Sequence, residues 1–100
     1  MVVVVTSNVV DRFRGFLASA MLEIASGVYT APRMSKAVRD RVWTVLADWH
    51  RELGGGSIVM TWRDAGEPCG QGIRTLGLPA RTFVELDGGL IATVTRQKLA

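Results

Sequence analysis

The chain has 100 residues, which is enough for one domain and excludes a second independent hydrophobic core. Hydrophobic residues make up 48% of the sequence and charged residues 21%, and the formal net charge is +3. The low share of charged residues indicates that another chain covers an apolar face, and we therefore expect a homodimer. The positive net charge favours nucleic acid as a partner.

The first predicted elements are a strand, a helix and a short strand. The β-branched run Val2–Val5 is typical of a central strand, and it is too short for a signal peptide or a membrane span. We therefore expect a cytoplasmic protein with no membrane partner. A helix that Asn8 or Asp11 can cap, and that ends before Gly27, is predicted by apolar residues at helical spacing: Phe13, Leu17, Ala20, Met21 and Ile24. Residues 28–30 predict a short strand.

The clearest helical pattern lies in the middle of the chain. Ser35 is a suitable capping residue at its start, and Gly54–Gly56 end it. Its apolar stripe consists of Val38, Val42, Val45, Leu46, Trp49 and Leu53. Residues 58–62 then alternate as in a strand with one buried face.

The last third of the chain predicts three more strands. A glycine-rich loop over residues 63–72 leads to a strand at 73–76. Strands at 83–86 and 90–95 flank a tight turn, Asp87-Gly88-Gly89.

These elements predict an α+β fold: a ferredoxin-like two-layer sandwich of two helices on a mixed sheet, with an extra C-terminal β-hairpin. The ferredoxin-like plan has a hairpin between its helices, where the sequence predicts only one strand. We divide the chain into a core domain, residues 1–80, and a C-terminal hairpin and tail, residues 81–100. Open strand edges favour pairing with another chain, so we expect the second part to dock to a partner.

Basic residues gather near the starts of the two predicted helices. The residues predicted to contact nucleic acid are Arg12, Arg14, Arg33, Lys36, Arg39 and, standing apart, Arg81. Arginine matches phosphate through two N–H groups, and two basic helix starts at one edge of a sheet would form a stripe along a duplex backbone. No helix presents base-reading residues on successive faces, so we expect backbone contact without sequence reading. Each residue taken alone is equally consistent with a solvated surface charge.

The sequence gives little support for catalysis. A metal-dependent nuclease needs carboxylates around a divalent cation, and the end of the first strand, Thr6-Ser7-Asn8, has none. Asp11 fits a helix start, and Glu23 would be a ligand only if the fold returned it to that strand. The lone Cys69 excludes an internal disulfide and a cysteine-based zinc cluster, and the lone His50 has no recognisable motif. We expect no catalytic residue, metal or cofactor; Mg²⁺ would be needed only by a nuclease.

Several short stretches, in order across residues 2–94, carry a resemblance through their combination. They are Val3-Val4-Val5-Thr6, Asn8-Val9, Arg12, Arg14-Gly15, Leu22-Glu23, Gly27-Val28-Tyr29, Ser35, Arg39, Trp43, Val59-Met60, Trp62, Gly77-Leu78, Arg81-Thr82 and Leu86-Asp87-Gly88. Together they resemble the small second CRISPR-associated protein, specifically its type I-E subgroup.

This resemblance implies a ferredoxin-like homodimer at the centre of the spacer-acquisition complex. In that family the dimer bridges two dimers of the CRISPR integrase and holds duplex DNA during integration. The resemblance implies DNA-backbone contacts at Arg12 and Arg14, and at Arg81 one half of a paired-arginine contact that Ala80 weakens. It also implies integrase docking through the C-terminal hairpin, by residues Thr82, Phe83, Val84, Glu85, Leu86, Asp87, Leu90 and Ile91.

Two other functions stay open beside this scaffold role. The first is a metal-dependent endonuclease acting on RNA or DNA, with its active site at the dimer interface. Relatives with nuclease activity use an aspartate near the first-strand threonine, where this chain has Ser7, so the scaffold is favoured. The second is a dimer that senses a small molecule, for which the sequence shows no ligand-pocket signature.

Overall fold

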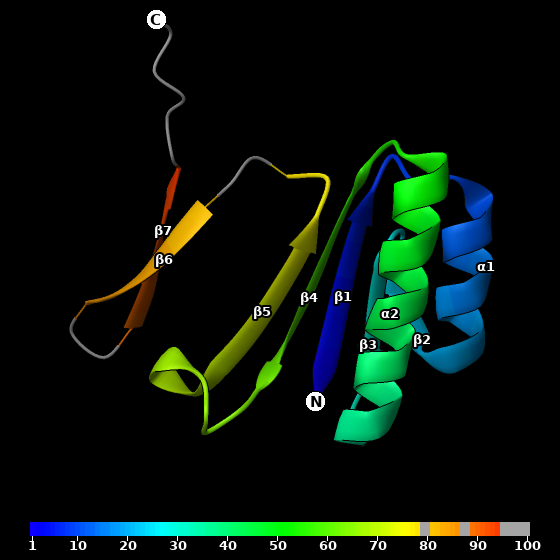
Figure 1. Cartoon of the computed structure of the whole chain (residues 1–100). Helices are drawn as coiled ribbons and strands as arrows, with labels where there is room; N and C mark the ends of the chain where they lie inside the picture. Colours follow the sequence, from blue (N-terminus) through cyan, green and yellow to red (C-terminus); the bar gives the residue numbers. More distant parts are fainter. Residues whose placement is uncertain (79–80, 87–88, 95–100) are drawn as a thin grey trace, which may run out of the picture.

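The computed structural model describes residues 1–78 and the two strands 81–86 and 89–94. The elements are β1 (Val2–Ser7), α1 (Asp11–Ala20), β2 (Leu22–Ala25), β3 (Val28–Ala31), α2 (Lys36–Leu53), β4 (Ser57–Arg63), the 3₁₀ turn η1 (Pro68–Gly70), β5 (Gln71–Leu76), β6 (Arg81–Leu86) and β7 (Gly89–Val94). Both helices lie on one face of a five-stranded sheet of order β2-β3-β1-β4-β5, while β6 and β7 form a separate two-stranded sheet (Figure 1). The predicted α+β, ferredoxin-like sandwich with a C-terminal hairpin is confirmed.

The strand β2 is where the sequence prediction was wrong. The helix predicted to continue through Ile24 ends at Ala20, and Leu22–Ala25 pairs with β3 as an antiparallel edge strand. Apolar residues at positions 21 and 24 fit a helical repeat, but only Met21 is buried, whereas Ile24 is 59% exposed. Pairing with β3 decided the conformation of this short segment, because the local pattern suited both structures.

Gly27 is a turn residue of the β2–β3 hairpin and not the end of a helix. Its φ of +76° lies in the region that favours glycine, and a Cβ there would lie 2.8 Å from the Thr6 carbonyl oxygen. The Thr6 amide donates to the Gly27 carbonyl at 2.7 Å, which ties the hairpin to the end of β1.

The extra strand also changes the directions of the elements. All four pairings in the five-stranded sheet are antiparallel, so the predicted mixed sheet was wrong. With two strands between the helices instead of one, α2 runs opposite to α1, and the start of α1 lies beside the end of α2 (Figure 1). The starts of the two helices therefore lie at opposite ends of the sheet.

Helix α2 and strand β4 follow the predicted pattern closely. The Ser35 side chain accepts the Val38 amide at 3.2 Å, as expected of a capping residue, and the helix ends at Leu53 before the glycines. On β4 the predicted alternation is confirmed, because Ile58, Met60 and Trp62 all face the helices and are buried.

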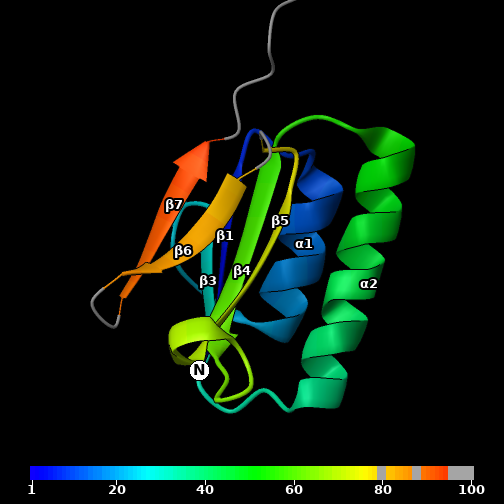
Figure 2. The same cartoon turned by 60° about the vertical axis from the view of Figure 1, so that its left-hand side comes forward.

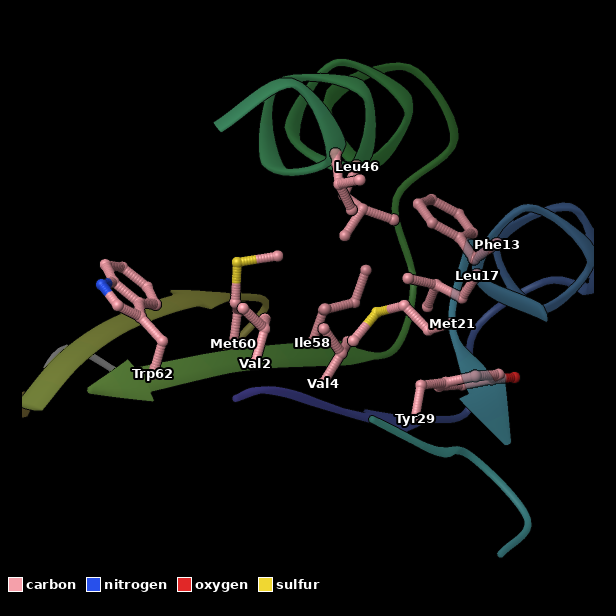
Figure 3. Close-up of a cluster of buried hydrophobic side chains, with 11 residues drawn as sticks. Val2, Val4, Phe13, Leu17, Met21, Tyr29, Leu46, Ile58, Met60 and Trp62 are labelled. Atoms are coloured by element: carbon pink, nitrogen blue, oxygen red, sulfur yellow. The ribbon is translucent and has the colours of Figure 1, made fainter. Parts of the chain in front are cut away.

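The hydrophobic core fills the space between the helices and the sheet (Figure 3). Val4 on the central strand pairs with Tyr29 on one side and Met60 on the other, so the three side chains share the helix-facing surface. In Figure 3, Trp62 lies at one end of the cluster and Phe13 and Tyr29 at the other. The buried set is Val2, Val4, Phe13, Leu17, Met21, Tyr29, Val42, Leu46, Ile58, Met60 and Trp62.

The other face of the five-stranded sheet carries no helix. The hairpin of β6 and β7 lies on this side, as Figures 1 and 2 both show. The side chains on this face are largely β-branched and half-buried, and Val5 is 43% exposed. An apolar sheet face without a helix is suited to packing against another protein surface.

Candidate nucleic-acid interface

Arg12 lies in the first turn of α1, and its guanidinium is stacked on an aromatic ring. The guanidinium carbon is 4.4 Å from the centroid of the Trp49 ring, near the end of α2. The side chain is exposed, and within the part of the chain that the structure describes its guanidinium has no ion-pair or hydrogen-bond partner. Stacking uses the flat face of a guanidinium and leaves the N–H groups at its edge available to an anion.

Arg14, only two residues further on, has a different environment. Its guanidinium nitrogen lies 3.9 Å from a carboxylate oxygen of Glu23 on β2, with side chains that are 46% and 36% exposed. Glu23 also accepts the Gly27 amide at 3.4 Å. Glu23 therefore partly neutralises the charge of Arg14, whereas it forms no ion pair with Arg12.

Tyr29 lies beneath this ion pair. Its hydroxyl is buried at the outer end of the core cluster (Figure 3), and no described group meets ordinary hydrogen-bond geometry with it. Burial raises the pKa of Tyr29, and the neighbouring Tyr29 hydroxyl and the Gly27 amide lower the pKa of Glu23. The Tyr29 hydroxyl, followed by the Glu23 charge, also raises the pKa of Arg14.

The basic residues near the start of α2 differ in whether they form an ion pair. The Lys36 ammonium is 3.2 Å from a carboxylate oxygen of Asp40, one turn along the helix. Arg33 is exposed in the loop before the helix, without an ion-pair partner among the described residues. An exposed pair such as Lys36 and Asp40 is weak, but the acid offsets the charge that a phosphate would bind.

Arg39 is mostly buried, which the sequence did not indicate. Its side chain is 11% exposed, and its guanidinium lies 4.1 Å from the centroid of the Trp62 ring and 3.6 Å from Asp40. Arg74 on β5 approaches the same ring at 5.1 Å. The guanidinium of Arg39 is thus occupied by packing between α2 and the sheet, and an approaching phosphate would meet little of it.

Acidic residues surround this second arginine–tryptophan cluster. The Trp62 indole N–H donates to Asp64 at 3.3 Å, and Arg74 lies 3.3 Å from Glu67. The Gly66 amide, followed by the Trp62 indole, lowers the pKa of Asp64. The cations Lys36, Arg39 and Arg74 are therefore matched by the anions Asp40, Asp64 and Glu67.

The expected continuous stripe of basic residues is not formed. Arg12 and Arg14 lie at one end of the sheet, and Arg33, Lys36 and Arg39 belong to the other end, because β2 reverses the direction of α2. The predicted edge with two basic helix starts was wrong for this reason. Of the predicted contacts, Arg12 is the one that best fits a phosphate contact. Its side chain is exposed, Trp49 orders its guanidinium, and it forms no ion pair with an acid among the described residues.

The remaining predicted contacts belong to the C-terminal hairpin. Arg81, Thr82, Phe83, Val84, Glu85, Leu86, Leu90 and Ile91 lie on β6 and β7, whose backbones pair in register from Arg81 with Val94 to Leu86 with Gly89. Asp87 lies outside the described residues, as do the side chains of the others. Their roles stay predictions.

The end of β1 is where a metal-dependent nuclease would need carboxylates. Ser7 is exposed at the strand end, and Asn8 has a φ of +56°. Glu23 does not return to this point, because β3 lies between β2 and β1 and Glu23 faces Arg14 instead. Within residues 1–78 and the two hairpin strands, no group of three or more His, Cys, Asp and Glu side chains could hold a metal ion.

The comparison with known families decides the identity of the chain. A family described as CRISPR-associated protein (Cas_Cas2CT1978) matches residues 1–91. The chain belongs to this family. The protein therefore has a CRISPR-associated role, as the resemblance implied at that level. None of the helices in the described residues is long and apolar enough to cross a membrane.

Three parts of the site were missed by sequence reasoning. Trp49 was assigned to the core, which is confirmed by its packing on Phe13 and Phe16, but its stack with Arg12 was not foreseen. Glu23 was considered only as a metal ligand, and Arg74 was not considered. Trp43, the other half-buried tryptophan of α2, packs in part against the core.

Proposed function

We propose that this protein is a homodimeric scaffold of CRISPR spacer acquisition, of the type I-E subgroup, which binds the backbone of duplex DNA and bridges integrase dimers in the cytoplasm. Membership of a CRISPR-associated family supports the biological setting. The observation that carries the DNA-binding part is the exposed guanidinium of Arg12, held on Trp49 without an acidic partner among the described residues. Arg14 is assigned a smaller share because Glu23 competes for it.

The sheet face that carries no helix supports the homodimer. Val5 and Val28 are paired across β1 and β3 on this face, and Val59 pairs with Val5 from β4. A second copy that packs here would bury these side chains and would repeat Arg12 on the other side of a two-fold axis. Two copies of Arg12 would then contact one duplex.

The hairpin of β6 and β7 is assigned to integrase docking. Its strands pair with each other and not with the five-stranded sheet, which keeps the hairpin distinct from the core. A two-stranded hairpin has open edges, and open edges are common sites of pairing with another chain. The residues assigned to this docking are Thr82, Phe83, Val84, Glu85, Leu86, Asp87, Leu90 and Ile91, whereas Arg81 is assigned to the duplex.

The test measures binding of labelled duplex DNA with and without the integrase, across a series of salt concentrations. Arg12→Ala together with Arg14→Ala is expected to weaken duplex binding and to reduce its salt dependence, because each phosphate that is no longer neutralised lowers the slope of log affinity against log salt by about 0.9. Arg41→Ala is the matched control, because Arg41 is an exposed arginine on α2. A double variant that binds duplex as the parent does would show that the assigned surface is wrong. Cleavage of DNA or RNA by the protein alone, abolished by EDTA, would favour the nuclease instead.

A further inference from the structure

We infer that Trp49 is a positioning residue for the phosphate contact of Arg12. This inference rests on the proposed function, since it concerns how the Arg12 contact is prepared. It assigns to an aromatic residue of α2 a part in nucleic-acid binding by a residue of α1.

Trp49 is itself held in place by aromatic neighbours. Its ring meets the Phe13 ring edge-on, with centroids 5.8 Å apart and planes at 79°. It meets the Phe16 ring at 5.2 Å and 67°. Phe13 is fully buried, so the tryptophan is fixed to the core through a rigid neighbour. A long exposed side chain stacked on this ring loses much of its rotational freedom before any ligand arrives.

The stack leaves the hydrogen-bonding edge of the guanidinium free. The guanidinium carbon of Arg12 lies over the Trp49 ring, and within the described residues none of its five N–H donors has a hydrogen-bond partner. An acidic partner would occupy those donors and cancel the charge, as Glu23 does in part for Arg14. The aromatic partner orders the guanidinium and leaves both its charge and its N–H groups available. Ordering the side chain in advance lowers the entropy lost when phosphate binds.

The position of the pair is set by the packing of the two helices. Antiparallel packing brings the first turn of α1 beside the end of α2, so Arg12 and Trp49 meet across two helices and not within one. The contact therefore depends on the tertiary structure, and the guanidinium direction is set by the scaffold. An exposed arginine without such a neighbour, such as Arg41, has no equivalent restraint among the described residues.

The test is a double-mutant cycle on the full chain, with duplex affinity measured at several salt concentrations. Trp49→Leu is expected to weaken duplex affinity roughly two- to fivefold for each engaged arginine, because that is the range of an exposed cation–π contact. Its salt slope should equal that of the parent, because Arg12 still reaches the phosphate. Arg12→Ala should lower both affinity and slope, the slope by about 0.9 for each phosphate that is no longer neutralised. In the Arg12→Ala background, Trp49→Leu should have no further effect.

Two controls separate positioning from folding. Trp43→Leu removes another half-buried tryptophan of α2, one with no arginine over its ring among the described residues, and should leave duplex affinity unchanged. Trp49→Phe keeps an aromatic face in the aromatic cluster and should retain most of the affinity, which provides the test if Trp49→Leu does not fold. Circular dichroism verifies that each measured variant is folded.

The outcomes distinguish this inference from the function on which it rests. If Arg12→Ala changes neither affinity nor slope, both the proposed surface and the positioning role are wrong. If Arg12→Ala has its expected effect but Trp49→Leu weakens binding equally with and without Arg12, only the positioning role is overturned. Disappearance of the Trp49 effect in the Arg12→Ala background establishes it.

Discussion

The two ends of the sheet each hold an arginine stacked on a tryptophan, and the two pairs differ in almost everything else. At one end, Arg12 lies over Trp49, is exposed and meets no acid among the described residues. At the other end, Arg39 lies over Trp62, is 11% exposed and is 3.6 Å from Asp40. The same kind of stack thus serves two purposes: it orders a free cation in one place and joins a helix to a sheet in the other.

Stacking alone does not identify a binding residue. What separates the pairs is the charge around them and the exposure of the guanidinium edge. Around Trp62, the cations and anions balance, so the local field offers little to a phosphate. Around Trp49, the guanidinium charge is unopposed within the described residues, which is the condition for attracting a polyanion.

The largest expected effect is that of removing the Trp62 ring. Trp62→Ala should destabilise the domain by about 3–5 kcal/mol, because a buried tryptophan fills the end of the core and supports two guanidinium groups. Urea unfolding followed by circular dichroism measures the change. Gly72→Ala provides an independent approach to the same ring, because a Cβ at Gly72 would overlap it, and should cost about 1–3 kcal/mol. If both variants unfold at the parental urea concentration, the ring does not support this end of the sheet.

Arg39→Ala and Arg12→Ala should have opposite profiles, with smaller effects than Trp62→Ala. Removing Arg39 should lower stability by about 1–2 kcal/mol, because its stacking and packing are removed, and leave the salt slope of duplex binding unchanged. Removing Arg12 should leave stability nearly unchanged and lower the slope. Parallel unfolding and binding measurements on both variants test this. A reduced salt slope for Arg39→Ala would place phosphate at the second pair and contradict the comparison.

Local signals in the sequence predicted the parts of the fold that local structure determines. Ser35 before the apolar stripe and the glycines after Leu53 located α2, and the alternation over residues 58–62 indicated the buried face of β4. The strand at 22–25 was not predicted, because a four-residue segment is too short to show a decisive period and Met21 and Ile24 continue the helical spacing of α1. The turn at Gly27 was the available signal for a hairpin, and it was interpreted as the end of a helix.

That single missed strand accounts for most of what was missed in the site. It fixes the direction of α2, and without it neither the separation of Arg12 from Arg39 nor the meeting of Arg12 with Trp49 follows. Lys36 and Arg39 are three residues apart on one helix, but this spacing holds no information about Trp62, which comes from β4. Burial of an arginine depends on what the fold places opposite it, so tertiary structure was needed.

The smallest expected effect concerns Glu23, which separates Arg14 from Arg12. The Tyr29 hydroxyl, the Gly27 amide and the Arg14 charge lower the pKa of Glu23 below its ordinary value of 4.5. A lowered pKa in the folded state means that the unfolded chain binds more protons, so this stabilisation is complete above pH 4.5 and is lost as the pH falls through the folded value. Glu23→Gln should therefore melt at a lower temperature than the parent at pH 7, and the two melting temperatures should converge as the pH falls below 4.5 and through the lowered pKa of Glu23.

The same variant sharpens the comparison of the arginines. Without the Glu23 charge, Arg14 loses its ion-pair partner, so Glu23→Gln should strengthen duplex binding at neutral pH by less than about fivefold, the range of an exposed ion pair. The gain should disappear when Arg14→Ala is added, because it depends on the released guanidinium. Melting curves across pH and duplex titrations at one salt concentration measure the two effects. If the melting temperatures of parent and Glu23→Gln stay equally far apart as the pH falls from 7 until both proteins unfold in acid, the carboxylate does not stabilise the fold through its charge. A gain in duplex binding that does not depend on Arg14 would assign the effect to the overall charge of the protein.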